Sequence, residues 1–322
     1  MPIPREALES IRTVCAHSYP DEPCADGMAS ALIVLDAFTD TKISLEIKFV
    51  SFNTREYDEL EAKPNMLFVD MTPPAARAKE FVDAGAIVLD HHATARPVVE
   101  LFGERGVFGE EPGVSGATLA FRYVWQRLVD VNVQADAEPF MRAFAELIGV
   151  RDTWQTKDPR WREATIAAKV LRFFAFEEWC DFNPFNGDPF RERMEMLGET
   201  LMRRDEAFVS KLIDSMWRFE GAGGERVVVL PSTVVSDAAE HPRLKETADV
   251  VVGFGYRSDG GGEPKLRLSF RSRGSYDVGE LAKQLGGGGH RNAAGAALSV
   301  HGGAFGEMDP YTAIRVIFGG AR

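Results

Sequence analysis

Short apolar runs alternate with longer segments of helical periodicity through the first half of the chain. The runs at residues 44–50, 66–69 and 86–89 have the length expected of strands, and the last two read as buried. The segments whose spacing predicts helices are residues 5–16, leading into the sheet, and residues 31–35, 115–128 and 139–148. Strands that alternate with helices predict an α/β domain built on a mainly parallel sheet.

The second half of the chain is predicted to begin with a long helical segment and to continue with strands. Residues 161–218 are predicted to be helical, with many aromatic residues that suit core packing better than base stacking. The strands predicted after them are residues 226–230, 250–254 and 265–270, and a helix is predicted at 278–285. The strand at 265–270 alternates polar and apolar positions, which is typical of a sheet with one wet face.

A glycine-rich segment at residues 221–224 suggests where the chain divides. We expect a first domain at residues 1–190, a helical linker at 191–224 and a smaller second domain at 225–322. A chain of 322 residues is long enough for two such domains, each with its own core.

Polar, metal-competent side chains follow the predicted strands at the points where they end. Asp70 follows the run at 66–69, and Asp90-His91-His92 follows the run at 86–89. Further candidates stand near predicted helix ends: His17, Asp26 and Asp152. Each of these alone could be an ordinary cap or turn. Together they indicate a shared site, because ligands of parallel sheets sit beyond the carboxyl ends of the strands.

Four successive glycines, Gly286–Gly289, precede His290 in the second half of the chain. Such a run suits a backbone that approaches a ligand closely, as an anion-binding nest does, or tight packing against a neighbouring segment; a flexible linker is the third reading. The spacing matches neither a P-loop nor a dinucleotide-binding loop. Arg271 and Ser272, at the end of a predicted strand, are good partners for phosphate.

The charge of the chain limits its partners. A net charge of −12 argues against clamping long nucleic acid through its phosphates, but it is compatible with a small phosphorylated substrate and with carboxylates that bind divalent cations. No apolar run reaches about 18 residues, and the N-terminus has no signal-peptide core. The three cysteines, at no metal-ribbon spacing, fit a reducing compartment, so we expect a cytoplasmic protein.

With these residues assembled, the chain resembles the DHH/DHHA1 phosphoesterase family, which includes RecJ-like nucleases, nanoRNA and pAp phosphatases and cyclic-dinucleotide phosphodiesterases. The motifs that carry the resemblance, in order, are Asp26, Asp70, Asp90-His91-His92, Asp152, Arg271-Ser272, Gly286–His290 and Ala293-Ala294-Gly295. The resemblance implies an N-terminal parallel-sheet DHH domain with helices on both faces. It also implies a smaller C-terminal α/β DHHA1 domain across a cleft.

The resemblance also implies roles for individual residues. Two divalent cations would be held by His17, Asp26, Asp70, His91 and Asp152. Asp70 would bridge them, Asp90 would orient its neighbours, and His92 would contact the scissile phosphate. The other end of the substrate would be gripped by residues of the second domain: Arg271, Ser272, Gly288, Gly289 and His290, with weaker claims for Arg291 and Asn292.

The first motif departs from the family pattern. Cys24 stands where the family has the first Asp, and His17 lies further upstream than usual. Asp21 could supply the missing carboxylate, Cys24 could bind as a thiolate, or that cation could be weakly held. A thiolate would favour Zn²⁺, whereas His and Asp ligands suit Mn²⁺. We favour Mn²⁺, with Asp21 among the ligands and Mg²⁺ or Zn²⁺ as alternatives.

These inferences predict an enzyme that hydrolyses short nucleotide substrates, such as nanoRNA, pNpN dinucleotides or pAp, through water activated by two metal ions. The alternatives are a cyclic-dinucleotide phosphodiesterase and a non-catalytic nucleotide sensor that has lost turnover through the change at Cys24. We expect no long duplex nucleic acid and no membrane as partners, and a monomer or a homodimer.

Overall fold

The computed structural model describes residues 3–19, 23–52, 54–130, 137–182, 188–231, 235–258, 263–273, 275–301 and 304–319. The chain forms two compact units, residues 1–201 and residues 202–322. No helix in the described ranges is both long and apolar enough to cross a membrane.

The N-terminal unit is organised around a parallel sheet, as predicted. Within the described residues it has five strands in the order β2-β1-β3-β4-β5, and every neighbouring pair is parallel. The strands are β1 (Thr13–His17), β2 (Glu46–Val50), β3 (Met66–Val69), β4 (Ile87–Asp90) and β5 (Gly106–Phe108). Strands β1, β3 and β4 are buried along their whole length, which explains why their sequences are continuous apolar runs.

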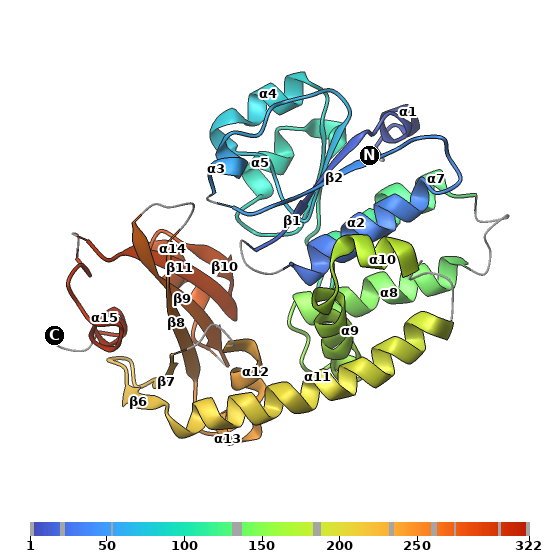
Figure 1. The fold of residues 1–322 in the computed structure, drawn as a ribbon. Helices are drawn as coiled ribbons and strands as arrows, with labels where there is room; N and C mark the ends of the chain where they lie inside the picture. Colours follow the sequence, from blue (N-terminus) through green and yellow to red (C-terminus); the bar gives the residue numbers. More distant parts are fainter. Residues whose placement is uncertain are drawn as a thin grey trace. The chain divides into compact units, whose positions relative to one another are not determined.

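Helices cover both faces of this sheet (Figure 1). One face packs against α4 (Ala78–Asp83) and α5 (Arg96–Glu100), where Phe68 of β3 meets Phe81 edge-on. The other face packs against α2 (Ala25–Ala37) and α6 (Gly116–Ala120), which continues through a π-helical turn, η3 (Phe121–Trp125), into α7 (Gln126–Leu128). The remaining elements of the unit are α1 (Arg5–Glu9), α3 (Arg55–Asp58), η1 (Ala75–Arg77), η2 (Gly103–Arg105), α8 (Ala137–Asp152), α9 (Trp161–Phe173) and α10 (Phe176–Phe182).

The prediction of one helix over residues 5–16 is wrong. Helix α1 ends at Glu9, and Thr13–His17 is the central strand β1, hydrogen-bonded to β2 on one side and β3 on the other. All five residues of this strand are buried, so the segment lacks the polar alternation that marks a half-exposed strand. As a result His17 ends a strand, in the same way as Asp90.

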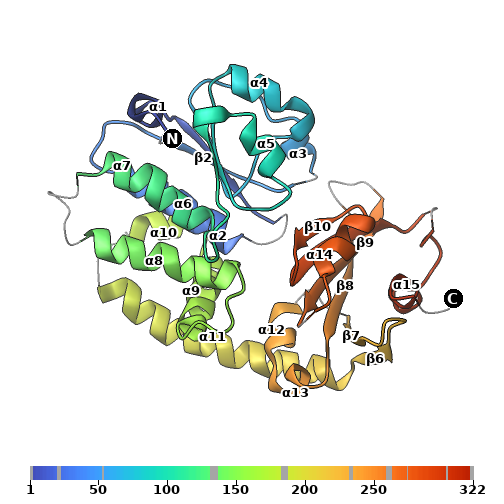
Figure 2. The ribbon, with the colours of Figure 1, turned by 180° about the vertical axis from the view of Figure 1, so that it is seen from behind.

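The C-terminal unit contains a mixed sheet with helices (Figure 2). Its described residues form six strands in the order β10-β11-β9-β8-β7-β6, all antiparallel except the pair β7 and β8. The strands are β6 (Trp217–Glu220), β7 (Arg226–Leu230), β8 (Val250–Ser258), β9 (Pro264–Ser272), β10 (Gly288–His290) and β11 (Ala293–Ser299). The helices are α11 (Asp188–Asp214), which begins in the first unit, α12 (Val235–Glu240), α13 (Pro242–Lys245), α14 (Val278–Gln284) and α15 (Pro310–Ile317).

The glycines at 221–224 lie in the turn between β6 and β7. Inside this turn the Gly221 carbonyl accepts a hydrogen bond from Gly224 N, and the Gly221 N–H donates one to Glu225 O. Since β6 belongs to the second sheet, the sequence-based boundary at residue 224 falls inside a hairpin. The two units divide between Leu201 and Met202, in the middle of α11.

Two glycines of the run after α14, Gly287 and Gly289, are explained by packing against β11. A Cβ on Gly287 would lie 2.0 Å from Gly295 O, and a Cβ on Gly289, whose φ is +135°, would lie 2.6 Å from Ala293 O. Only glycine lets β10 approach β11 this closely. Tight packing, one of the readings of the sequence, is therefore sufficient reason for these glycines.

Candidate metal centre

The predicted metal-binding residues of the N-terminal unit come together at the carboxyl ends of its strands. His17 ends β1, Asp70 follows β3, and Asp90 ends β4 and is followed directly by His91. Helix ends supply the others: Asp26 lies in the first turn of α2, Cys24 is its N-cap, and Asp152 is the last residue of α8. Asp21 lies outside the described residues.

A close approach between α2 and β1 brings Cys24 to His17. A Cβ on Gly27 would lie 2.0 Å from His17 O, so a side chain at this position would push the helix away from the strand. Gly27, which ends the stretch Cys24-Ala25-Asp26-Gly27, therefore has a steric role, because it lets the first turn of α2 pack on the end of β1.

Asp70 is the centre of the cluster. Its Oδ1 lies 3.2 Å from His91 Nε2, and its Oδ2 lies 3.4 Å from His17 Nδ1 and 3.5 Å from Cys24 Sγ. The residue is 1% exposed and has a φ of +59°, a left-handed backbone conformation that is costly for a non-glycine residue. The two oxygens of its carboxylate face different partners, as a bridging ligand requires.

A second group of ligand atoms surrounds His91 Nε2. Asp26 Oδ2 lies 3.6 Å away and Asp152 Oδ2 lies 3.3 Å away. The ligand atoms of Asp26, His91 and Asp152 all lie within 4.8 Å of one another, and the same holds for His17, Cys24 and Asp70. The structure thus brings together every described residue that the sequence proposed as a metal ligand in this unit.

Asp90 orients the two histidines that follow it. Its Oδ1 accepts hydrogen bonds from the backbone N–H groups of His91 (2.7 Å) and His92 (2.9 Å), and it lies 2.8 Å from His92 Nδ1. This arrangement fixes the direction of the His92 ring and favours a proton on its Nδ1.

Ser115 is a positioning residue that the sequence analysis did not single out. It is the N-cap of α6, and its hydroxyl also donates to Asp26 Oδ1 at 2.8 Å. The backbone N–H groups of Gly116 and Ala117 donate to the same carboxylate at 2.6 and 2.9 Å. A serine before a helix predicts only a cap, since nothing local shows that a carboxylate 89 positions earlier will share that helix end.

The charges of the cluster are poorly balanced without a cation. Burial, together with the charges of Asp70 and Asp152, raises the pKa of Asp26 well above its usual range. Burial lowers the pKa of His91, but Asp70, Asp152 and Asp26 outweigh it and raise that pKa to about 10. Burial also raises the pKa of the Cys24 thiol, and the three carboxylates raise it further.

For Asp70 the balance of effects is different. Burial favours its neutral form, but the neighbouring imidazoles of His17 and His91 outweigh burial and hold its pKa well below the usual range. The cluster therefore retains a buried carboxylate that needs positive charge beside it, which a proton on His91 or a metal ion can supply.

The donor atoms fit a divalent cation. Within the part of the chain that the structure describes, His17 Nδ1 and Asp152 Oδ2 are buried and have no hydrogen-bond partner. Buried polar atoms are almost always hydrogen-bonded, so such atoms aimed into a cluster of carboxylates point to a ligand. Imidazole nitrogens and carboxylate oxygens are suitable donors for Mn²⁺ and Zn²⁺.

The predicted substrate-binding residues of the C-terminal unit also lie together, at the end of β9 and around the turn between β10 and β11. Arg271 is half-buried and donates to Ser236 Oγ (3.0 Å) and to Phe270 O (2.8 Å). Ser272 is 4% exposed, and its hydroxyl donates to Tyr276 O at 2.8 Å, which closes the loop that follows β9.

The turn residues are more accessible. Gly288, Gly289 and His290 form the half-buried strand β10, and Arg291 is exposed, with a hydrogen bond from its guanidinium to Ser275 O. Asn292 O accepts a hydrogen bond from Ser272 N at 3.0 Å. Ser272 and Asn292 thus stabilise the loop after β9, and Arg271, His290 and Arg291 are the side chains of this group that carry cationic or imidazole nitrogens.

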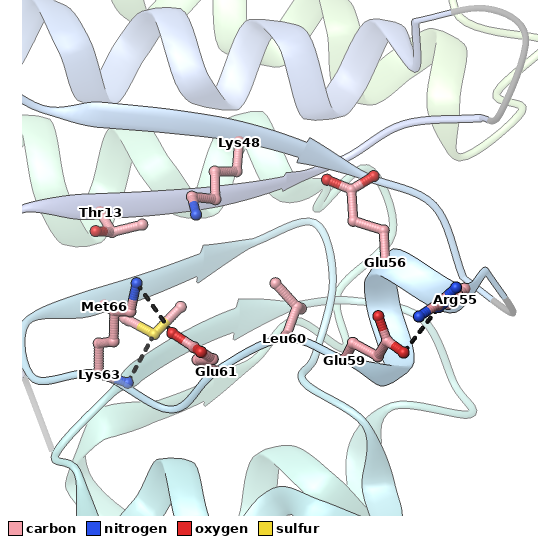
Figure 3. A pocket seen from close by; sticks show the side chains of 9 residues that line it. All are labelled: Thr13, Lys48, Arg55, Glu56, Glu59, Leu60, Glu61, Lys63 and Met66. Atoms are coloured by element: carbon pink, nitrogen blue, oxygen red, sulfur yellow. Dashed lines mark hydrogen bonds and ion pairs between the residues drawn. The ribbon is translucent and has the colours of Figure 1, made fainter.

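A separate pocket of about 490 Å³ opens beside β1, β2 and β3 (Figure 3). Its lining includes Thr13 and Met66, the first residues of β1 and β3, whereas the His/Asp cluster lies at the opposite ends of these strands. Its cations are paired with carboxylates, Lys48 with Glu46, Arg55 with Glu59 and Lys63 with Glu61. The pocket contains none of the candidate metal ligands.

Comparison with known proteins agrees with this architecture. Residues 228–304 match the DHHA1 domain family. No protein of curated function matches the chain by sequence. The C-terminal unit therefore carries a DHHA1 domain.

Solved structures show the same fold over nearly the whole chain. A DHH domain from a protein described as belonging to a family of ribosomal proteins is 13% identical, with a TM-score of 0.57 over 91% of this chain and 84% of that one. An exopolyphosphatase-related protein from Bacteroides fragilis is 13% identical, with a TM-score of 0.53 over 97% and 92%. CDC45 from Entamoeba histolytica is 7% identical, with a TM-score of 0.51 over 98% and 97%. At these identities the likeness shows a shared fold and nothing further.

Proposed function

We propose that this chain, in which a DHH-like His/Asp cluster precedes a DHHA1 domain, is a phosphoesterase that hydrolyses short nucleotide substrates with two divalent cations. The observation that carries the proposal is the pair of donor groups, His17, Cys24 and Asp70 on one side and Asp26, His91 and Asp152 on the other, with Asp70 Oδ1 also close to His91. Two adjacent cations at such a cluster would activate the attacking water and offset charge on the phosphoryl oxygens.

The protein's own residues have distinct parts in this reaction. The water would lose a proton to solvent as its oxygen bonds to phosphorus, the bond from phosphorus to the leaving ester oxygen would break, and that oxygen would take up a proton from solvent. Burial disfavours the charged form of His92, and so does neighbouring His91, but Asp90 and Asp70 outweigh both and raise the pKa of His92. With Nδ1 held by Asp90, the imidazolium would donate from Nε2 to the substrate phosphate and stabilise charge that develops there.

Several features support a short substrate. The net charge of −12 disfavours long nucleic acid, whose binding depends on many cationic contacts to phosphate. Arg271, His290 and Arg291 offer cationic or hydrogen-bonding groups for one further phosphate or a sugar, and we propose that they bind the substrate away from the scissile bond. Dinucleotides, oligoribonucleotides of a few residues and pAp meet these requirements.

The test is a substrate panel with the metal-stripped, reconstituted protein. Purified protein would be loaded with Mn²⁺, Mg²⁺ or Zn²⁺ and incubated with pNpN, two- to five-nucleotide RNA, pAp and cyclic dinucleotides, and the products would be identified by mass spectrometry. We expect release of mononucleotide from pNpN or short RNA, or of the corresponding monophosphate from pAp.

Two variants give the panel its controls. Asp83→Asn removes an exposed carboxylate of α4 that pairs with Lys79, and it should hydrolyse at the wild-type rate. Asp70→Asn should be inactive. If the protein bound intact dinucleotide but did not hydrolyse it with Mn²⁺, with Mg²⁺ or with Zn²⁺, the proposal would be contradicted and a nucleotide sensor would be favoured.

A further inference from the structure

The donor atoms on the two sides of Asp70 differ in chemical character. Around Oδ1 lie His91 and, beyond it, Asp26 and Asp152, so that group offers one nitrogen and several oxygens. Around Oδ2 lie His17 Nδ1 at 3.4 Å and Cys24 Sγ at 3.5 Å, so this second group offers nitrogen, sulfur and oxygen. One carboxylate thus faces a hard donor set and a softer one.

Cys24 stands at the start of α2 without using its side chain to cap that helix. It is the N-cap of this helix, is 5% exposed, and its own side chain makes no capping hydrogen bond. The position would suit serine, threonine or aspartate if capping were its purpose. Its sulfur instead lies beside Asp70.

His17 gives an independent indication that a ligand belongs there. It is 7% exposed, and among the described residues its Nδ1 has no hydrogen-bond partner, although Asp70 Oδ2 lies 3.4 Å away. A nitrogen kept buried without a hydrogen bond is unfavourable, and a bound cation would recover that loss.

The spacing of the three atoms fits a small tetrahedral ion. Bond lengths of about 2.0 Å to nitrogen and oxygen and about 2.3 Å to sulfur place neighbouring donors roughly 3.3–3.5 Å apart in a tetrahedron. The separations from Asp70 Oδ2 are 3.4 Å to nitrogen and 3.5 Å to sulfur. Three protein ligands leave one place for water or substrate, as in catalytic zinc sites.

We propose that His17, Cys24 and Asp70 bind a thiophilic divalent cation such as Zn²⁺ through a Cys24 thiolate, and that Asp26, His91 and Asp152 bind a harder ion such as Mn²⁺. The centre is then a mixed-metal pair that shares Asp70. This inference rests on the proposed two-cation function and assigns the two positions different metals. Thiolate ligands select zinc-like ions, and carboxylates suit Mn²⁺.

Cobalt substitution tests the thiolate directly. The metal-stripped wild-type protein loaded with Co²⁺ should show a near-ultraviolet thiolate-to-cobalt charge-transfer band. Two controls should keep the band: Cys15→Ala removes the other buried thiol of this unit, and Cys180→Ser removes an exposed thiol. Cys24→Ser and Cys24→Asp should lose the band. Cys24→Asp should still bind two ions, but the ratio of its Zn²⁺ affinity to its Mn²⁺ affinity should be at least about tenfold lower than in the wild type.

A measurement on the wild-type protein keeps the test independent of whether the variants fold. X-ray absorption at the zinc edge of protein loaded with one equivalent of Zn²⁺ should show one sulfur neighbour at about 2.3 Å. A shell of nitrogen and oxygen alone, or a cobalt band that persists in Cys24→Ser, would overturn the inference and leave Cys24 as a thiol that donates to Asp70.

Hydrolysis of the substrate panel without sulfur ligation would refute this inference alone, whereas sulfur ligation without hydrolysis would refute the proposed function alone. Failure of the wild type to bind any of these ions would refute both.

Discussion

Replacing Ser115 by alanine should weaken metal binding more than it weakens the fold. The hydroxyl of Ser115 donates to Asp26 Oδ1 at 2.8 Å, while Asp26 keeps two backbone donors at 2.6 and 2.9 Å. The carboxylate therefore stays in place in the variant, but it loses one of the hydrogen bonds that fix its direction toward His91.

The magnitude follows from the charge of Asp26. In the metal-free protein the raised pKa of Asp26 favours its neutral carboxyl, which accepts a weaker hydrogen bond from Ser115 than a carboxylate does. The capping contact from Thr118 N to the Ser115 hydroxyl is also long, at 3.5 Å. We therefore expect Ser115→Ala to lower the free energy of unfolding by roughly 1 kcal/mol. With metal bound the carboxylate is charged. Loss of a residue that orients a ligand typically lowers affinity about 10–100-fold, equivalent to about 1.4–2.7 kcal/mol.

The assay combines urea denaturation with and without Mn²⁺ and direct titration of Mn²⁺ by electron paramagnetic resonance. Thr118→Val is the matched control, because Thr118 shares the capping box of α6 with Ser115 and its hydroxyl bonds to the backbone of Ser115. It should destabilise the metal-free protein by about 1 kcal/mol and leave the Mn²⁺ affinity within about threefold of wild type. If Ser115→Ala and Thr118→Val bound Mn²⁺ equally well, Ser115 would be a helix cap and nothing more.

Three further predictions concern other positions. Asp70→Asn, which tolerates the left-handed backbone at φ +59°, should lower hydrolysis by at least about 1000-fold with an unchanged circular dichroism spectrum; retained activity would contradict the bridging role. Gly27→Ala, whose Cβ would lie 2.0 Å from His17 O, should cost about 3 kcal/mol or more in urea denaturation, and a wild-type midpoint would show that α2 is free to shift. Hydrogen bonds from Arg226 lower the pKa of Asp249 from 3.8 to about 2, so its stabilisation is present above pH 3.8 and is lost as the pH falls through 2. For this partly exposed pair we expect Asp249→Asn to cost about 0.5–1 kcal/mol at neutral pH, a small part of that at pH 2 and nothing well below pH 2, and a cost independent of pH would refute the assignment.

The local pattern of the sequence was enough to predict the strands that end on Asp70 and Asp90, because short buried runs bounded by polar residues have few other conformations. It was not enough for residues 13–17, where a fully buried central strand shows no alternation and was predicted as helix. His17 was therefore predicted as a ligand from its place near a predicted helix end and from the family resemblance, and not from recognising that it ends a strand.

The sequence by itself determined which residue types could bind metal and that they stand next to strand and helix ends. Tertiary structure decided which of them face the same oxygen of Asp70, because that depends on the left-handed turn after β3 and on how closely α2 packs against β1. It also decided that Ser115 holds Asp26, and that Gly287 and Gly289 accommodate β11. Contacts between residues distant in sequence are set by packing of whole elements, and no local pattern of side chains encodes them.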